Sequence, residues 1–262
     1  MTAAAVAWAD LSGSLLRLPL ALRLALEDIN GKYRRTVLGP LWIAVGQAAT
    51  IAGFVIVFSG LFQVAPENYA LYLAAGFPVW AFISSFLNDM PASFINAKAF
   101  LETFDLPWLT YIWRRSIGYA LVFFHQLVTL FIAMAFLGVV PSVNMLYAIP
   151  ALVVILIGGT GVGLILAVFG ARYRDLQPAM VVSSGVLFLF SPIVWRAEQL
   201  RVNEWAVHFN PIYYCMKLVR DPLLGIAPDW NVWLYTSLGS LAAFFLGFAI
   251  FIVSRRRLYH WL

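Results

Sequence analysis

Charged residues are scarce in this sequence. Only 11% of its 262 residues are Asp, Glu, Lys or Arg, whereas 63% are hydrophobic. Because a soluble domain carries about 25% charged residues, this scarcity excludes an ordinary soluble domain and predicts a membrane protein. Cysteine is nearly absent as well. Cys215 stands alone, which excludes an internal disulfide and a cysteine-based metal cluster.

A nucleotide-binding loop is also missing. The single Gly-Lys pair, at 31–32, lacks the preceding glycine spacing of a phosphate-binding loop. The run GGTGVG at 158–163 has no lysine and lies inside an apolar stretch. Its Gly159/Gly163 spacing therefore predicts close helix packing rather than a phosphate site.

Histidines and buried acids offer no reactive site either. His125, His208 and His260 lie far apart in the sequence and form no metal-ligand pattern. There is no GxSxG motif and no acid pair at a catalytic spacing. Within the apolar runs, only His125 lies well inside, and Asp89 lies at an end. Ion-driven transporters usually need buried acids, so we expect a non-enzymatic chain, without a cofactor of its own, that draws energy from elsewhere.

Six apolar runs have the length that a bilayer requires, which is about 20 residues. They cover residues 37–62, 71–88, 117–140, 146–170, 179–195 and 233–254. The sequence therefore predicts an all-α integral membrane protein with six transmembrane helices and a single domain, 1–262. Residues 1–36 form its amphipathic segment, 37–254 its membrane part and 255–262 a tail.

The placement of cations predicts the orientation. Most cations lie on one set of connections, at Arg17, Arg23, Lys32, Arg34, Arg35, Lys98, Arg114, Arg115, Arg172, Arg174 and Arg255 to Arg257. The connections on the other side hold Arg196, Arg201, Lys217 and Arg220, offset by four acids. Cytoplasmic loops carry the excess of Lys and Arg, so both termini are expected in the cytoplasm. The net charge of +5 suits lipid headgroups and indicates no nucleic-acid partner.

The segment before the first run has a polar stripe. Its members recur at helical spacing, at Arg23, Glu27, Asn30 and Arg34, and an opposite face holds Leu22, Leu26, Ile29 and Tyr33. This pattern predicts an amphipathic helix in the membrane interface, ended by Gly39-Pro40, where the first span starts. An ordinary anchor of positive charges is the alternative.

Three connections between the predicted spans are expected to form short structured elements. Residues 91–107 can form one short helix, and 171–178 pack two cations and an acid into one turn, although solvated loops are the alternative for both. Residues 196–232 are too long for a turn and too apolar for a solvated loop. Short re-entrant helices are expected there, with a helix on the outer surface as the alternative.

Four motifs in order resemble the permeases of bacterial polysaccharide-export ABC transporters, the type-2 class of O-antigen, capsule and teichoic acid exporters. DINGKYRRTVLGPLW precedes the first span, RYRDL follows the fourth, SPIVW closes the fifth and NPIYY…VRDPLLG precedes the sixth. The resemblance covers almost the whole chain. It departs at Glu102 and Asp105, where relatives usually carry more basic residues before the proline, so the contacts of that loop are not carried over.

The resemblance implies a homodimer in the bacterial inner membrane with two copies of a separate ATPase, which binds the ATP and Mg²⁺. The ATPase would contact the two cytoplasmic elements through Asn96, Lys98, Glu102, Arg172, Arg174 and Asp175. The motif at the start of the first span holds Arg34, Arg35, Gly39 and Pro40. An outer gate would be formed by Asn210, Pro211, Tyr213, Tyr214, Arg220 and Asp221.

Aromatic residues suggest the cargo. Sugars stack on aromatic faces, and a chain longer than the bilayer needs a continuous corridor with many weak contacts. The expected lining is Phe54, Phe58 and Phe62 facing Phe188, Phe190 and Trp195, with Tyr33 and Trp42 at the cytoplasmic mouth. A lipid-facing stripe is the alternative. The function predicted is export of a lipid-linked polysaccharide, O-antigen first, whereas a permease for a drug or simpler lipid and an integral membrane glycosyltransferase are the competing functions.

Overall fold

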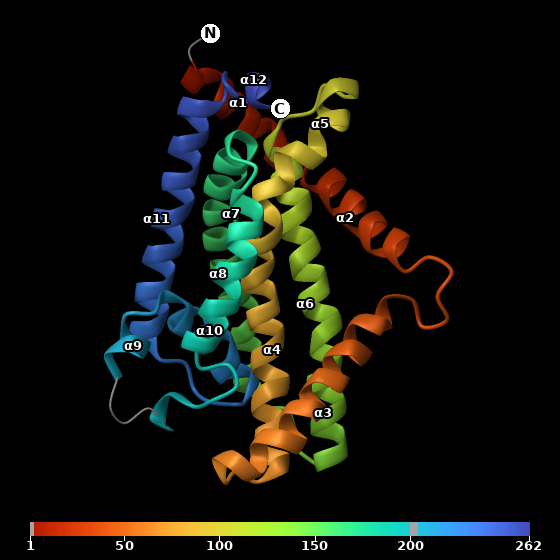
Figure 1. Ribbon diagram of the computed structural model, residues 1–262, viewed down its shortest axis with the longest axis vertical. Coiled ribbons are helices and arrows are strands. Elements are labelled where there is room, and N and C mark those ends of the chain that lie inside the picture. Colours follow the sequence, from red (N-terminus) through yellow and green to blue (C-terminus); the bar gives the residue numbers. More distant parts are fainter. Residues whose placement is uncertain (1–2, 200–203) are drawn as a thin grey trace.

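The computed structural model describes residues 3–199 and 204–262, and every regular element in them is helical. Five helical stretches are long and apolar enough to cross a membrane: Gly39–Phe62, Pro66–Thr103, Leu109–Leu137, Val143–Arg172 and Trp230–Ser254. The predicted all-α membrane fold is confirmed (Figure 1).

The α-helices are α1 (Ala3–Leu16), α2 (Leu18–Lys32), α3 (Trp42–Phe62), α4 (Pro66–Asp89), α5 (Ser93–Thr103), α6 (Leu109–Leu137), α7 (Ala148–Arg172), α8 (Leu176–Phe190), α9 (Glu204–His208), α10 (Pro211–Leu223), α11 (Trp230–Ser254) and α12 (Leu258–Trp261). Short 3-10 turns are η1 (Gly39–Leu41), η2 (Met90–Ala92), η3 (Val143–Tyr147) and η4 (Ala197–Gln199).

The predicted fifth span, 179–195, is shorter than expected. Its helix α8 has 15 residues, about 22 Å at 1.5 Å per residue, against ~30 Å of hydrocarbon. Residues 191–195, predicted as helix, are not helical, because Pro192 disfavours the helical conformation of the residue before it. Ser191 accordingly is extended, with φ −102° and ψ 140°. By length and composition, the bent pair α1 and α2 is a further candidate span, with 67° between its halves.

The helix α2 packs differently from the prediction. Its buried residues are Ala21, Ala25 and Ile29, and α2 packs on α6, so this face contacts protein. Leu22 and Leu26 remain exposed and are available to acyl chains. The helix ends at Lys32, so the predicted end at Gly39-Pro40 is wrong.

Glycines bring α7 against two neighbours at once. On one side, a Cβ at Gly161 would lie 2.4 Å from the Cα of Phe244 on α11. On the other side, a Cβ at Gly159 would lie 2.7 Å from the ring of Phe86 on α4, and one at Gly163 would lie 2.7 Å from the side chain of Met90 in η2. The close packing predicted for this glycine run is confirmed, and it extends to α11 through Gly161.

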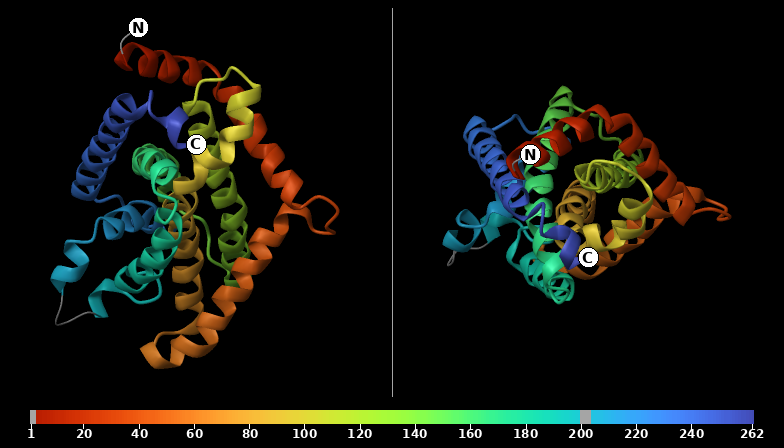
Figure 2. Two further views of the ribbon diagram at one scale, coloured as in Figure 1. Left: turned by 45° about the horizontal axis from the view of Figure 1, so that its top comes forward. Right: turned by 90° about the horizontal axis from the view of Figure 1, so that it is seen from above.

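Both chain ends lie at one end of the bundle, together with α1, α5 and α12; we call it the terminal end (Figures 1 and 2). The residues predicted as a tail fold back there. Arg255 is ion-paired with Asp10 on α1, and its guanidinium lies 4.3 Å from the ring centroid of Trp108. The other Asp10 oxygen accepts a hydrogen bond from the backbone N–H of Trp108 at 3.0 Å. Leu258 of α12 is completely buried. The opposite end of the bundle, with the connections after α3 and α6, is called the distal end.

Candidate functional site

A row of phenylalanines follows one face of α3. The rings of Phe54 and Phe58 stack with centroids 5.5 Å apart, and those of Phe58 and Phe62 with centroids 5.7 Å apart. All three are partly buried. The row continues to Tyr69 at the start of α4, 6.0 Å from Phe62. The spacing of four residues on one helix explains this stacking, as the sequence suggested.

A ring on α4 connects this row to α8. Phe77 lies 5.4 Å from Phe54 and 6.2 Å from Phe188, and Phe188 lies 5.7 Å from Trp80. The helices α3 and α8 both pack on α4 (Figure 1). One predicted ring of each span, Phe54 and Phe188, therefore contacts Phe77 of the same chain, a residue that the sequence did not identify. The aromatic residues on α3, α4 and α8 that make these contacts are called the aromatic row.

The other predicted corridor residues lie apart from this row. Phe190 is 60% exposed, and Trp195 is half-buried with its Nε1 donating to the carbonyl oxygen of Leu189 at 3.2 Å. Trp42 is exposed at the first position of α3. Tyr33 lines a separate cavity at the terminal end. Whether these side chains face a second copy of the chain stays a prediction.

The non-helical segment after α8 is held by two tyrosines of α4. The hydroxyl of Tyr69 donates to the carbonyl oxygen of Val194 at 2.8 Å. The hydroxyl of Tyr72 reaches the carbonyl oxygens of Pro192, at 3.0 Å, and Trp195, at 2.9 Å. Irregular backbone at membrane depth requires protein partners for its polar groups. These tyrosines, one helical turn apart, supply them.

Arg220 bonds to the same groups, and we call Tyr69, Tyr72, Arg220 and residues 191–195 the tyrosine–arginine cluster. Its Nη1 donates to the Tyr72 hydroxyl at 2.7 Å and to the Pro192 carbonyl oxygen at 2.6 Å. The guanidinium also lies 4.5 Å from the Tyr72 ring centroid, and its Nε is 3.9 Å from a carboxylate oxygen of Asp221. Arg220 is only 6% exposed. The sequence predicted it on an outer connection, but the structure buries it on α10, where it bonds to α4 and to the segment after α8.

The helix α10 confirms the expectation of short helices within 196–232, of which residues 200–203 lie outside the described part. Asn210 caps α10 by accepting from the N–H of Ile212 at 2.9 Å, and its Nδ2 donates to Ser191 Oγ at 2.9 Å. Pro211 is the first residue of the helix, where its missing N–H leaves no bond unmade. Within α10, Met216, Leu218, Val219 and Leu223 are buried.

The remaining predicted gate residues lie nearer the surface of α10. Tyr213 and Tyr214 are partly buried, with ring centroids 5.2 Å apart. An ion pair of 3.1 Å joins Lys217 to Asp229, the N-cap of α11. The hydrogen bond from Lys217 lowers the pKa of the Asp229 carboxyl. Thus Asn210 connects the start of α10 to the end of α8, and Lys217 connects the middle of α10 to the N-cap of α11.

The two predicted coupling elements meet the folded tail at the terminal end. Lys98 on α5 donates to the backbone oxygen of Leu262 at 2.8 Å and lies 4.0 Å from Glu102. The Arg172 guanidinium lies 5.4 Å from the ring centroid of Trp261. All six predicted coupling residues are exposed: Asn96, Lys98, Glu102, Arg172, Arg174 and Asp175. Residues 93–103 form the expected short helix, and 173–175 form a tight connection.

The motif before α3 forms a reversal of the chain. Arg35 has φ 69° and Gly39 has φ 56°, a region that glycine enters at little cost. Pro40 then lies in the turn η1 that leads into α3. Arg34 and Arg35 are both exposed, and the 33–38 connection turns the chain from α2 into α3 (Figure 1).

Comparison with known proteins supports a transport role for this arrangement. The family model described as "ABC-2 type transporter" matches residues 24–224. The chain is also similar to a curated protein of Klebsiella pneumoniae named "O-antigen export system permease protein RfbA". The two are 26% identical over 198 residues, which cover 71% of this chain and 73% of the relative.

Proposed function

This chain belongs to the ABC-2 type transporter family, and from that premise we propose that its cargo is a lipid-linked polysaccharide, with O-antigen as the first candidate. It is a multi-pass membrane protein and a transport subunit without a catalytic domain. Permeases of this family pair with ATPase subunits. The name of the distant Klebsiella pneumoniae relative supports the choice of cargo.

The aromatic row is the observation that carries this proposal. It runs along α3 and crosses α4 to α8. Large apolar side chains of α3 and α8 are also exposed, including Ile56, Val57 and Leu61 on α3 and Val182 and Leu189 on α8. A second copy of the chain would cover them and enclose a corridor lined by rings. We propose this homodimer as the transport path, with α10 closing its distal end.

Removing single rings tests the cargo path. Phe58→Ala and Phe188→Ala should each lower surface polysaccharide about fivefold, since a sugar–ring contact contributes ~1 kcal/mol. Membrane levels of the protein should stay near normal. The control is Phe136→Ala, which removes a ring of α6 that is 87% exposed and lies outside the row. Export that is unchanged by both variants, or reduced only in step with protein level, would assign the row to packing.

The terminal end is proposed as the cytoplasmic face, where two copies of an ATPase carrying ATP and Mg²⁺ dock. The support is the exposed charge on α5 and on the connection 172–175. These elements share contacts with residues 261–262, so movement of one would be transmitted to the other. The bacterial inner membrane follows as the location, with the whole chain acting as one domain.

Charge reversal at this surface tests both the docking and the orientation. Arg174→Glu should lower cargo-stimulated ATP hydrolysis of the purified complex by about tenfold, because a repulsive charge at an interface costs over 1 kcal/mol. The matched control, Glu67→Lys, reverses an exposed charge at the distal end and should leave hydrolysis unchanged. Equal effects of the two variants would remove the terminal end as the ATPase surface.

A further inference from the structure

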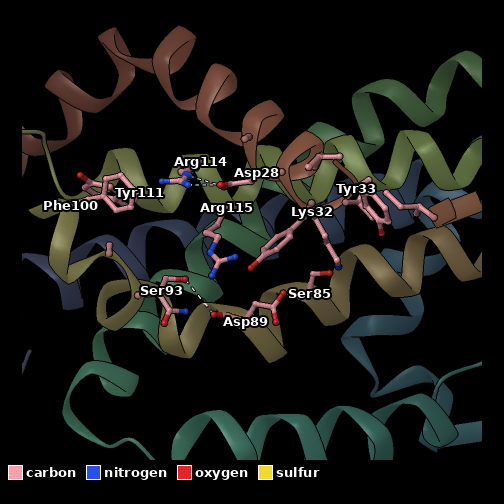
Figure 3. Close-up of a pocket in the computed structure, with 18 residues that line it drawn as sticks. Asp28, Lys32, Tyr33, Ser85, Asp89, Ser93, Phe100, Tyr111, Arg114 and Arg115 are labelled. Carbon is pink, nitrogen blue, oxygen red and sulfur yellow. Dashed lines mark hydrogen bonds and ion pairs between the residues drawn. The ribbon is translucent and has the colours of Figure 1, made fainter. Parts of the chain in front are cut away.

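A cavity of about 570 Å³ lies at the terminal end, apart from the aromatic row. Its walls come from α2, α4, α5 and α6, and it includes Lys32, Tyr33, Asp89, Arg114 and Arg115 (Figure 3). Most of the polar residues that line this cavity have no role in the proposed corridor or in the proposed ATPase-docking surface. The charges and hydroxyl groups around it indicate what it binds.

Two cations face the cavity without a carboxylate in contact. Arg114 is already paired, since its Nε donates to Asp28 at 2.7 Å. Among the described residues, by contrast, neither Arg115 nor Lys32 has a carboxylate oxygen within 4.0 Å. The Nζ atom of Lys32 lies 5.7 Å from the ring centroid of Tyr33. Figure 3 shows Arg115 and Lys32 extending from the α6 and α2 side toward α4.

Two buried hydroxyl groups beside the cavity also have no partner. Tyr111 is 3% exposed and Tyr119 is 7% exposed, and in the part of the chain described here neither hydroxyl makes a hydrogen bond. Buried polar groups are paired in about 90% or more of cases. Figure 3 shows Tyr111 beside Phe100, at a distance from Arg115 and Asp89. The orphaned hydroxyl of Tyr119, which also lines the cavity, is therefore the one that points to an occupant that accepts hydrogen bonds.

One carboxylate opposes the two cations. Asp89 lies at the end of α4 with its side chain exposed to the cavity region. Arg115 and Lys32 together outnumber it by one charge, so the net field favours an anion. Because Asp89 is farther than ion-pair distance from both cations, an anion can enter between them. Charge-assisted bonds of this kind suit phosphate oxygens.

The surroundings favour a lipid over a soluble anion. Ala25, Ile29, Ile43 and Val122 line the cavity beside the charged groups, and Leu22 is exposed on the neighbouring face of α2. An apolar wall next to a polar one matches a molecule with a tail and a charged head. We propose that this cavity binds the phosphate headgroup of a membrane lipid. In the proposed function, which this inference deepens and rests on, the headgroup would be that of the lipid carrier of the polysaccharide.

Direct binding tests the cavity without relying on export. The full chain, purified with its ATPase partner, is titrated with farnesyl diphosphate, and binding is followed by tryptophan fluorescence. Arg115→Gln should weaken binding by about tenfold, because a bond between a charged donor and phosphate is lost. Asp89→Asn should tighten it several-fold by removing the opposing charge. Tyr119→Phe should weaken it several-fold without lowering Tm, because its hydroxyl has no partner to lose.

The controls separate the possible sources of phosphate. Arg23→Gln removes an exposed cation of α2 that is not among the cavity residues and should leave binding unchanged. Equal binding of farnesol would overturn the phosphate assignment, and equal binding of inorganic pyrophosphate would overturn the lipid assignment. Equal binding of dihexanoyl phosphatidylglycerol would keep the lipid-phosphate site but assign it to bulk phospholipid. With that result, the cavity would still be a lipid-phosphate site, whether or not the cargo is a polysaccharide.

Discussion

Replacing Gly161 by alanine is expected to separate α7 from α11 and to remove most of the folded permease from the membrane. The new Cβ would lie 2.4 Å from both N and Cα of Phe244. Backbone atoms cannot rotate away as a side chain can, so the whole helix must move. A cost of about 3 kcal/mol, at the upper end for overpacking, is expected. The measurement is the Tm of the detergent-solubilised protein together with its level in membranes.

A second glycine provides the matched control. Gly185 lies within α8 and a Cβ there would meet no atom within 4 Å. Gly185→Ala should therefore be neutral or stabilise the helix by up to ~1 kcal/mol. The prediction can fail clearly: if Gly161→Ala and Gly185→Ala have the same Tm, α7 and α11 do not approach as closely as described.

Replacing Arg220 by methionine is expected to abolish export and to lower stability by about 3 kcal/mol, the cost of breaking a buried charged pair. The substitution removes the bonds to Tyr72 and Pro192 and leaves Asp221 without its neighbouring cation. Loss of the buried charge recovers some desolvation energy. That gain is smaller than the loss, because the non-helical backbone has few other donors at this depth.

The same helix offers a control for charge. Lys217 is also on α10, but its ion pair with Asp229 is partly exposed, and such pairs contribute about 0–1 kcal/mol. Lys217→Met should therefore keep export and shift Tm little. Surface polysaccharide and thermal unfolding are measured for both variants. A stable, exporting Arg220→Met protein would show that the tyrosine–arginine cluster does not hold the segment after α8.

The sequence was sufficient to predict features that depend on residues near one another in the chain. Five of the six spans were found from their apolar length, the short helix α5 from its periodicity, and the close packing of α7 from glycines four residues apart. The order of four motifs predicted the family. Boundaries were less accurate: α2 ends at Lys32 and α8 at Phe190, because a chain reversal and a pre-proline residue interrupted patterns that looked continuous.

The candidate sites depended instead on contacts between distant parts of the chain. Tyr72 and Arg220 are 148 residues apart, and nothing in the local pattern of either indicates the other. The same holds for Phe77 between Phe54 and Phe188, and for Lys32 and Arg115 around one cavity. The sequence by itself determined five of the segments that are long and apolar enough to cross the membrane, because the bilayer imposes length and hydrophobicity on each helix separately. Only the tertiary structure decided which polar groups meet, because helix rotation and tilt are set by packing against neighbours.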